Sequence, residues 1–228
     1  MSADTPSPRK RVVVLLSGRG SNMIALLDAA KASDYPADIV AVLSDKDDAG
    51  GLTIARERGL AAEAVTRTGF ASKAAHEAAL IEAIEAQAPD LICLAGYMRL
   101  LSADFVRRYA GRILNIHPSL LPLFPGLDTH QRAVDAGVRL HGCTVHFVDE
   151  GMDEGAIVAQ AAVPVLPNDT AATLSARVLT AEHRLYPQAL ALVASARAWL
   201  GADGRTEFSP SLSSPSAAML LAPTVLLN

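Results

Sequence analysis

The sequence predicts an α/β fold: a Rossmann-like, doubly wound, mostly parallel sheet with an antiparallel C-terminal portion. Half of the residues are hydrophobic and only 4% are aromatic, a composition typical of aliphatic strands covered by alanine-rich helices. Short apolar runs alternate with helical patterns in the first part of the chain, which implies parallel strands joined by helical crossovers. After residue 140, two strand-like segments are separated only by an acidic loop.

The first predicted element is a strand at residues 12–16, because this continuous apolar run fits a strand buried on both faces. A glycine turn at 17–22 leads into a helix at 23–32. The elements that follow are expected as strands at 39–43 and 91–95 and helices at 51–58 and 76–87.

The next element is a short strand that carries Asn115 and His117 on one face, since alternate strand residues point the same way. Pro118, Pro122 and Pro125 then forbid a long helix and stiffen the following loop. The remaining elements are expected as strands at 143–148, 157–165 and 204–208 and a helix at 170–198, kinked or broken at Pro187. Residues 1–11 are expected to be a disordered lead-in, and residues 209–228 a poorly ordered low-complexity tail.

Charge, hydropathy and cysteine content exclude several classes of partner. The net charge of −4, without an extended basic run, argues against nucleic acid. The apolar stretch 217–227 is too short to span a bilayer, and residues 1–8 lack the apolar segment of a signal peptide. Cys93 and Cys143 are expected to be buried thiols, which favours a cytoplasmic protein.

The glycine turn is a candidate phosphate site. Glycines let the backbone approach a ligand closely, and a helix N-terminus presents free amides to an anion. Such a turn can also serve packing alone. A dinucleotide fingerprint, with Asp45 as the ribose acid, is disfavoured because Met23 occupies the position of the third glycine.

Asn115 and His117 are candidates for acyl-transfer chemistry, because an amide can stabilise an oxyanion beside an imidazole that moves a proton. A structural pair at a strand-to-loop corner is the alternative. One carboxylate of the acidic loop 149–155 could orient the imidazole, although spacing does not say which one. No metal site is expected, because the other histidines have no metal-ligand spacing: His76, His130, His141, His146 and His183.

Five segments give the chain a resemblance to a known family. They are Ser17-Gly-Arg-Gly-Ser-Asn, Leu94-Ala-Gly-Tyr-Met-Arg, Asn115-Ile-His-Pro-Ser-Leu-Leu-Pro, His141-Gly-Cys-Thr-Val-His-Phe-Val and Ala181-Glu-His-Arg-Leu-Tyr-Pro. From about residue 12 to about residue 208 the sequence resembles the glycinamide ribonucleotide formyltransferases, which use 10-formyltetrahydrofolate in purine biosynthesis. The resemblance implies a single formyltransferase domain at 12–208, with a phosphate-binding half (about 12–110) and a folate and catalytic half (about 111–208). It also implies small-molecule substrates and a monomer or homodimer.

The resemblance implies a role for each matching residue. Asn115, His117 and Asp153 would be catalytic. The expected substrate contacts are Gly20, Ser21 and Asn22 to the phosphate and Glu182 to the ribose. The expected folate contacts are Lys73, Met98, Arg99, Leu100, Leu101 and Asn115. Departures from the family pattern fall at Lys73, Asp128 and Glu154, outside the catalytic trio.

Three other functions compete with this one. A methionyl-tRNA formyltransferase would need an extra domain and a basic surface, and the chain has neither the length nor the charge. A formyltetrahydrofolate hydrolase would transfer the formyl group to water and usually carries an amino-terminal regulatory domain. A non-catalytic sensor of a phosphorylated ligand would have no need of Asn115, His117 and Asp153.

Overall fold

The computed structural model describes residues 8–210, which form two compact units divided between Leu100 and Leu101. The N-terminal unit comprises residues 8–100 and the C-terminal unit residues 101–210. The expected disorder of the tail concerns residues that lie almost wholly outside the described part.

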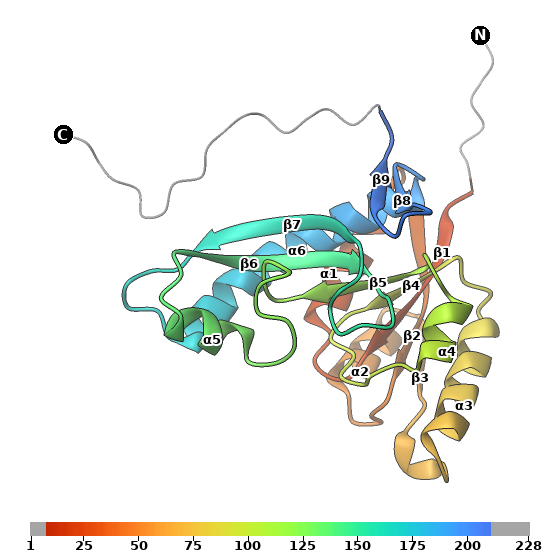
Figure 1. The fold of residues 1–228 in the computed structure, drawn as a ribbon. Coiled ribbons are helices and arrows are strands. Elements are labelled where there is room, and N and C mark those ends of the chain that lie inside the picture. The colour runs from red at the N-terminus through yellow and green to blue at the C-terminus, as the bar shows by residue number, and fades with distance from the viewer. Residues whose placement is uncertain (1–7, 211–228) are drawn as a thin grey trace. The chain divides into compact units, whose positions relative to one another are not determined.

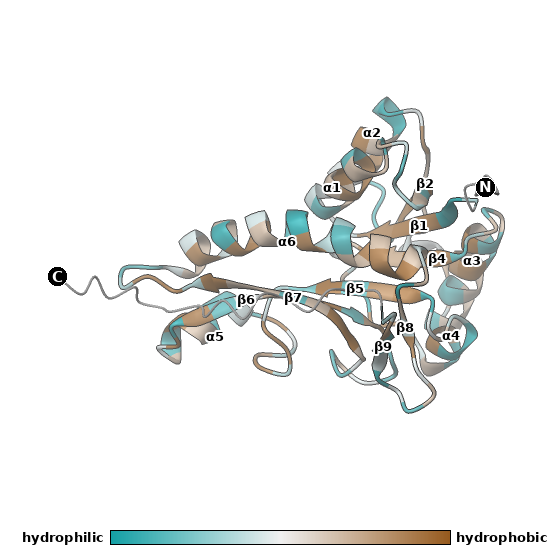
Figure 2. Ribbon diagram, turned by 90° about the horizontal axis from the view of Figure 1, so that it is seen from above, coloured by the Kyte–Doolittle hydropathy of each residue, from teal (hydrophilic) through white to brown (hydrophobic). Residues whose placement is uncertain are grey.

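The N-terminal unit is a parallel sheet with helical crossovers (Figure 1). Its strands have the order β3-β2-β1-β4. Figure 2 shows α1 and α2 on one face of this sheet and α3 on the other, as right-handed crossovers require. Its elements are β1 (Lys10–Leu16), α1 (Ser21–Ala29), β2 (Ala37–Ser44), α2 (Gly50–Glu57), β3 (Ala61–Ala64), the 3-10 turn η1 (Arg67–Gly69), α3 (Lys73–Glu85) and β4 (Leu91–Leu94).

The C-terminal unit is antiparallel in its strands. β6 pairs with β5 on one side and with β7 on the other, and the long helix α6 packs against β6 and β7. A separate hairpin joins β8 to β9. The elements are α4 (Ala103–Arg108), β5 (Ile113–His117), α5 (Thr129–Asp135), β6 (Leu140–Phe147), β7 (Ile157–Pro164), α6 (Ala171–Ala194), β8 (Ala198–Leu200) and β9 (Thr206–Phe208).

The predicted fold class is confirmed: a doubly wound parallel part is followed by an antiparallel part. The run 12–16 is completely buried, as expected for a strand covered on both faces, and Figure 2 shows β1 and β4 as hydrophobic strands. Burial of these aliphatic side chains stabilises the sheet by about 1.5–3 kcal/mol for each fully buried Val or Leu.

Several expected boundaries were wrong. β1 begins at Lys10, so Lys10 and Arg11 belong to the sheet and not to a lead-in. α3 begins three residues early because the Ser72 hydroxyl accepts a hydrogen bond from the Ala75 amide and caps the helix. α6 runs unbroken through Pro187, because its packing outweighs the backbone hydrogen bond that proline removes. The short elements β3, α4, α5 and β8 were not predicted.

Candidate active site

The register of β5 against β6 gathers polar side chains on one face of the C-terminal sheet. Asn115 lies directly opposite His146, and His117 directly opposite Thr144. Residues directly opposite each other in antiparallel strands share a face. His117, His146 and Thr144 are buried, and Asn115 is partly buried. These four residues form a polar cluster on that face of the sheet.

His117 is held from two sides. Its Nδ1 lies 3.3 Å from Oδ2 of Asp153, and its Nε2 lies 3.1 Å from the carbonyl oxygen of Phe124. Asp153 has a positive φ of 59°, a left-handed conformation that directs its side chain back toward β5. The same carboxylate oxygen accepts a hydrogen bond from the Gly126 amide at 2.8 Å. The acidic loop (residues 149–155) and the proline loop (residues 118–126) therefore meet at the imidazole of His117.

Two other acids of the loop, Asp149 and Glu150, have different partners. Asp149 accepts a hydrogen bond from the Gly151 amide, and Glu150 forms an ion pair with Arg107 at 2.8 Å. Both side chains are exposed. Of the acids in this loop, Asp153 is the one that contacts His117.

Asn115 contacts a second histidine. Its Nδ2 lies 3.2 Å from Nε2 of His146, whose Nδ1 lies 2.9 Å from the carbonyl oxygen of Phe147. Burial lowers the pKa of His146, while the Phe147 carbonyl and the Asp153 carboxylate act in the opposite direction. Nε2 of His146 also lies 3.8 Å from Oδ1 of Asp153, which is beyond hydrogen-bond distance.

The proline loop is fixed by buried polar contacts behind the site. The Thr144 hydroxyl donates to the Ser119 carbonyl at 2.7 Å and accepts from the Leu121 amide at 3.1 Å. The Gln160 amide group donates to the Leu121 carbonyl at 2.9 Å, and the Ser119 hydroxyl donates to the Leu123 carbonyl at 2.6 Å. These bonds hold the loop segment that presents the Phe124 carbonyl to His117.

The glycine turn lies in the N-terminal unit, between β1 and α1. Gly20 has a φ of 77° and precedes the first helical residue, Ser21. A Cβ on Gly20 would lie 2.9 Å from the Cα of Gly51 and 3.1 Å from the Met23 side chain. Glycine is therefore required by both conformation and space. Met23 is completely buried beneath the turn, and α1 directs its first-turn amides, including that of Asn22, toward the turn.

The segment expected to contact folate also lies at the carboxyl edge of the N-terminal sheet. The Met98 amide donates to the Ser17 hydroxyl at 2.8 Å, which ties this segment to the glycine turn. Arg99 donates through Nε to Asp45 at 2.6 Å, so the acid considered for a ribose is instead an ion-pair partner. Met98 and Leu100 are 63% and 69% exposed, which leaves two apolar side chains uncovered.

Three further expected residues have simpler surroundings. Lys73 begins α3 and lies 3.7 Å from Glu77, with its side chain half exposed. Leu101 precedes α4 in the C-terminal unit and is partly exposed. Glu182 lies on α6, buried near Cys143. Burial raises the pKa of the Cys143 thiol to about 12, and the Glu182 charge adds to that effect.

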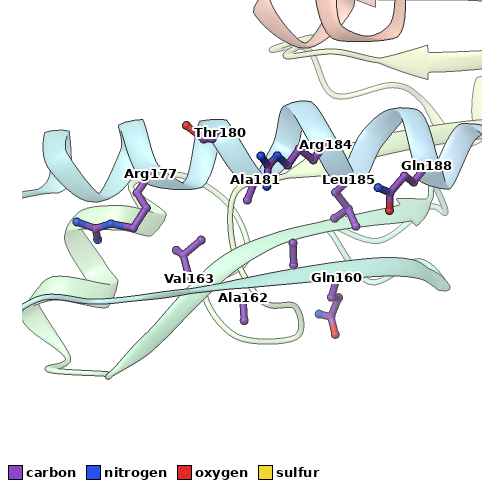
Figure 3. A pocket seen from close by; sticks show the side chains of 10 residues that line it. Gln160, Ala162, Val163, Arg177, Thr180, Ala181, Arg184, Leu185 and Gln188 are labelled. Carbon is purple, nitrogen blue, oxygen red and sulfur yellow. The ribbon is translucent and has the colours of Figure 1, made fainter. Parts of the chain in front are cut away.

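Two pockets lie away from these residues. One of about 510 Å³ lies between β7 and α6, where Figure 3 shows Val163 and Leu185 directed into the space between strand and helix. Another of about 470 Å³ lies beside β3, η1 and α3. Neither is lined by Asn115, His117 or Asp153, so pocket size does not identify the candidate site.

Within residues 8–210, no group of three or more His, Cys, Asp and Glu side chains is arranged to hold a metal ion. No helix in the same part of the chain has the length and hydropathy needed to cross a membrane.

The sequence did not predict three contacts at the site: the Phe124 carbonyl to His117, the Gly126 amide to Asp153, and His146 to Asn115. The first two depend on loop conformation, for which the sequence has no signal. The third follows from the register of β5 against β6, because it pairs Asn115 with His146.

Comparisons with known proteins agree with the resemblance. Residues 10–190 match the model of the family described as formyl transferase. The phosphoribosylglycinamide formyltransferase of Escherichia coli is 45% identical over 201 residues, covering 85% of this chain and 94% of that protein. The crystal structure of a phosphoribosylglycinamide formyltransferase from Brucella melitensis has 57% identity and a TM-score of 0.81, covering 94% of this chain and 99% of that one.

A third relative is much longer than this chain. The trifunctional purine biosynthetic protein adenosine-3 of Drosophila melanogaster is 48% identical over 197 residues, which cover 86% of this chain but 15% of that protein. The chain thus spans at most 20% of the length of the trifunctional relatives from Drosophila and cattle.

Proposed function

Because the chain belongs to the formyl transferase family, we propose that it transfers the formyl group of 10-formyltetrahydrofolate to the amine of 5'-phosphoribosylglycinamide in de novo purine biosynthesis. The observation that carries this proposal is the position of His117, which contacts Asp153 on one side and the proline loop on the other. The Asn115 amide lies two residues away on the same face of the strand.

The reaction needs one carbonyl activated and one proton moved. The substrate amine attacks the formyl carbon, a C–N bond forms, and the carbonyl oxygen becomes an oxyanion. The Asn115 amide and the His117 imidazolium stabilise this charge, and one well-placed donor is worth about 3–4 kcal/mol. The bond from the formyl carbon to the folate nitrogen then breaks, and the proton lost by the amine goes to that nitrogen.

The two contacts of His117 assign its nitrogens different tasks. Nδ1 faces Asp153, whose carboxylate orients the ring. Nε2 faces a backbone carbonyl, that of Phe124. A carbonyl is an acceptor, as the formyl oxygen and the oxyanion are. In the proposed reaction the substrate oxygen replaces Phe124 as the acceptor of this N–H.

Substrate binding is assigned to both units. Gly20, Ser21 and Asn22 would hold the phosphate, since the turn leaves no room for a side chain at Gly20 and is followed by a helix N-terminus. Glu182 would bind the ribose hydroxyls. Lys73, Met98, Arg99, Leu100, Leu101 and Asn115 would contact the folate, and the exposure of Met98 and Leu100 supports this assignment.

The proposal also covers the cellular compartment, the oligomeric state and the partners of the protein. We propose a cytoplasmic enzyme, monomeric or homodimeric, with small-molecule substrates and neither a metal nor a nucleic-acid partner. The buried thiols Cys93 and Cys143 are suited to a reducing compartment.

Folate absorbance during turnover tests the proposal. Purified protein would be mixed with 10-formyltetrahydrofolate, with and without 5'-phosphoribosylglycinamide, and compared with His117→Ala. We expect turnover that requires the amine substrate and falls at least about 10²-fold in the variant. Thermal unfolding of both proteins would verify that the variant is folded.

Two of the alternative functions give a different result in this experiment. Turnover without the amine would identify a formyltetrahydrofolate hydrolase. Absence of turnover in both conditions, with retained binding of the phosphorylated substrate, would identify a non-catalytic sensor.

A further inference from the structure

His146 is directly opposite Asn115 in the sheet and contacts its side chain. Its Nδ1 lies 2.9 Å from the Phe147 carbonyl oxygen. A carbonyl oxygen can only accept a hydrogen bond, so Nδ1 must carry a proton. The proton position of a neutral imidazole is thus decided by the backbone: Nδ1 is the donor and Nε2 is a bare acceptor.

The surroundings of His146 favour the neutral ring. The side chain is about 2% exposed, and burial lowers its pKa. Three ionisable groups influence it: Asp153 and Asp149 favour the charged ring, and His117 opposes it. The nearest carboxylate oxygen, Oδ1 of Asp153, is 3.8 Å from Nε2, too far for the hydrogen bond that would hold a charged ring.

A bare acceptor at Nε2 decides which end of the Asn115 amide faces it. The carbonyl oxygen of the amide would meet the nitrogen lone pair and be repelled, whereas the NH₂ group can donate. The 3.2 Å contact is made by Nδ2, the donor end of the amide. Asn115 makes no other side-chain hydrogen bond in the part of the chain that the structure describes, so the second N–H of Nδ2 is available.

We propose that His146 is a positioning residue: as the neutral Nδ1–H tautomer it accepts one N–H of Asn115 and directs the other toward the developing oxyanion. The proposal rests on the proposed formyl transfer and deepens it. Without His146 the amide can rotate by half a turn, which presents the Asn115 oxygen where a donor is needed. A preorganised donor would become a repulsive acceptor in part of the population.

The tautomer can be measured without substrate. In protein labelled with ¹⁵N and ¹³C at histidine, the ring shifts of His146 are expected to report neutral Nδ1–H at pH 7–8. The assignment would come from the spectrum of His146→Gln. An Nε2–H tautomer, or an imidazolium at pH 7, would overturn the proposal, because neither can accept from Asn115.

Kinetics test the consequence for turnover. His146→Leu removes the acceptor, and kcat is expected to fall about 10–100-fold with KM changed less than about threefold. His146→Gln places a carbonyl oxygen in reach of the Asn115 amide, and it is expected to recover most of the loss. Equal losses in the two variants would contradict the proposal.

A double-mutant cycle separates positioning from a general effect on folding. If His146 acts through Asn115, His146→Leu should cost little in a protein that already carries Asn115→Ala. His141→Leu is the matched control, because His141 is another buried histidine of β6 and lies opposite Val163 of β7, not opposite Asn115. The fold-loss of kcat caused by His141→Leu should be the same with and without Asn115→Ala. Independent effects of His146 and Asn115 would overturn the proposal.

The experiment distinguishes this proposal from the proposed function. Inactive wild-type protein would refute formyl transfer and leave the tautomer measurement standing as a test of the contact. An active wild type with an unaffected His146→Leu would retain the function and refute the positioning role.

Discussion

The Nδ1 atom of His117 lies 3.3 Å from Oδ2 of Asp153. The same oxygen accepts the Gly126 amide at 2.8 Å. Strand β5, the proline loop and the acidic loop are thereby joined through one atom. These contacts fix the positions of both loops relative to His117.

Replacement of Asp153 tests this link. Asp153→Asn keeps the size of the side chain but removes the negative charge that faces Nδ1 of His117, so kcat is expected to fall at least about 10²-fold with KM nearly unchanged. Steady-state kinetics give both values. Asp149→Asn is the matched control, because Asp149 is an exposed acid of the same loop whose side chain accepts a hydrogen bond from the Gly151 amide and does not contact His117. Similar kcat values for the two variants would remove Asp153 from the mechanism.

The phosphate site can be tested at Gly20. Gly20→Ala must place a Cβ 2.9 Å from the Gly51 backbone, in a residue with a φ of 77°. The turn must shift, and KM for the phosphorylated substrate is expected to rise at least about tenfold. Gly18→Ala is the control, since a Cβ there meets nothing within 4 Å. Titration with inorganic phosphate gives the same comparison without catalysis. Equal affinities in both variants would place the phosphate elsewhere.

The sequence predicted best where burial is complete. The apolar runs at 12–16 and 91–95 were predicted as strands covered on both faces, and they form β1 and β4, the latter ending at Leu94. The sequence predicted less well where local chemistry sets a boundary. Ser72 starts α3 earlier than the apolar pattern does, and the packing of α6 outweighs the expected effect of Pro187.

The residues of the candidate site also differ in how well the sequence predicted them. The alternation of β5 was enough to place Asn115 and His117 on one face. It could not choose Asp153 among the acids of its loop, because that depends on a left-handed residue in an irregular segment. The contact with His146 depends on the pairing of two strands distant in sequence, which composition and periodicity do not encode.

The close approach of β6 and β7 makes a stability prediction. A Cβ on Gly142 would lie 1.9 Å from the Ala161 carbonyl oxygen and 2.9 Å from the Leu120 side chain. Because the nearest atom is backbone, the strands must separate. Gly142→Ala is expected to lower the free energy of unfolding by at least about 3 kcal/mol.

Denaturant unfolding measures this change. Gly69→Ala is the control, since a Cβ at Gly69 meets nothing within 4 Å, and its effect should be within about 1 kcal/mol. A Gly142→Ala protein as stable as the Gly69→Ala protein would show that the β6–β7 pair tolerates a side chain there.

His141 makes stability depend on pH. Burial, with smaller effects of His130 and His117, lowers its pKa to about 4, whereas the unfolded chain has the ordinary histidine value of about 6.5. Between these values the unfolded state binds a proton that the folded state does not. This contribution to stability is therefore complete above pH 6.5 and is lost as the pH falls, by about 3 kcal/mol at pH 4.

His141→Gln removes the titrating group at the same buried position. Urea unfolding of both proteins from pH 7 to pH 4 should give a stability difference that changes in favour of the variant as the pH falls. A difference that stays constant with pH would mean that His141 is protonated as readily in the folded protein as in the unfolded chain.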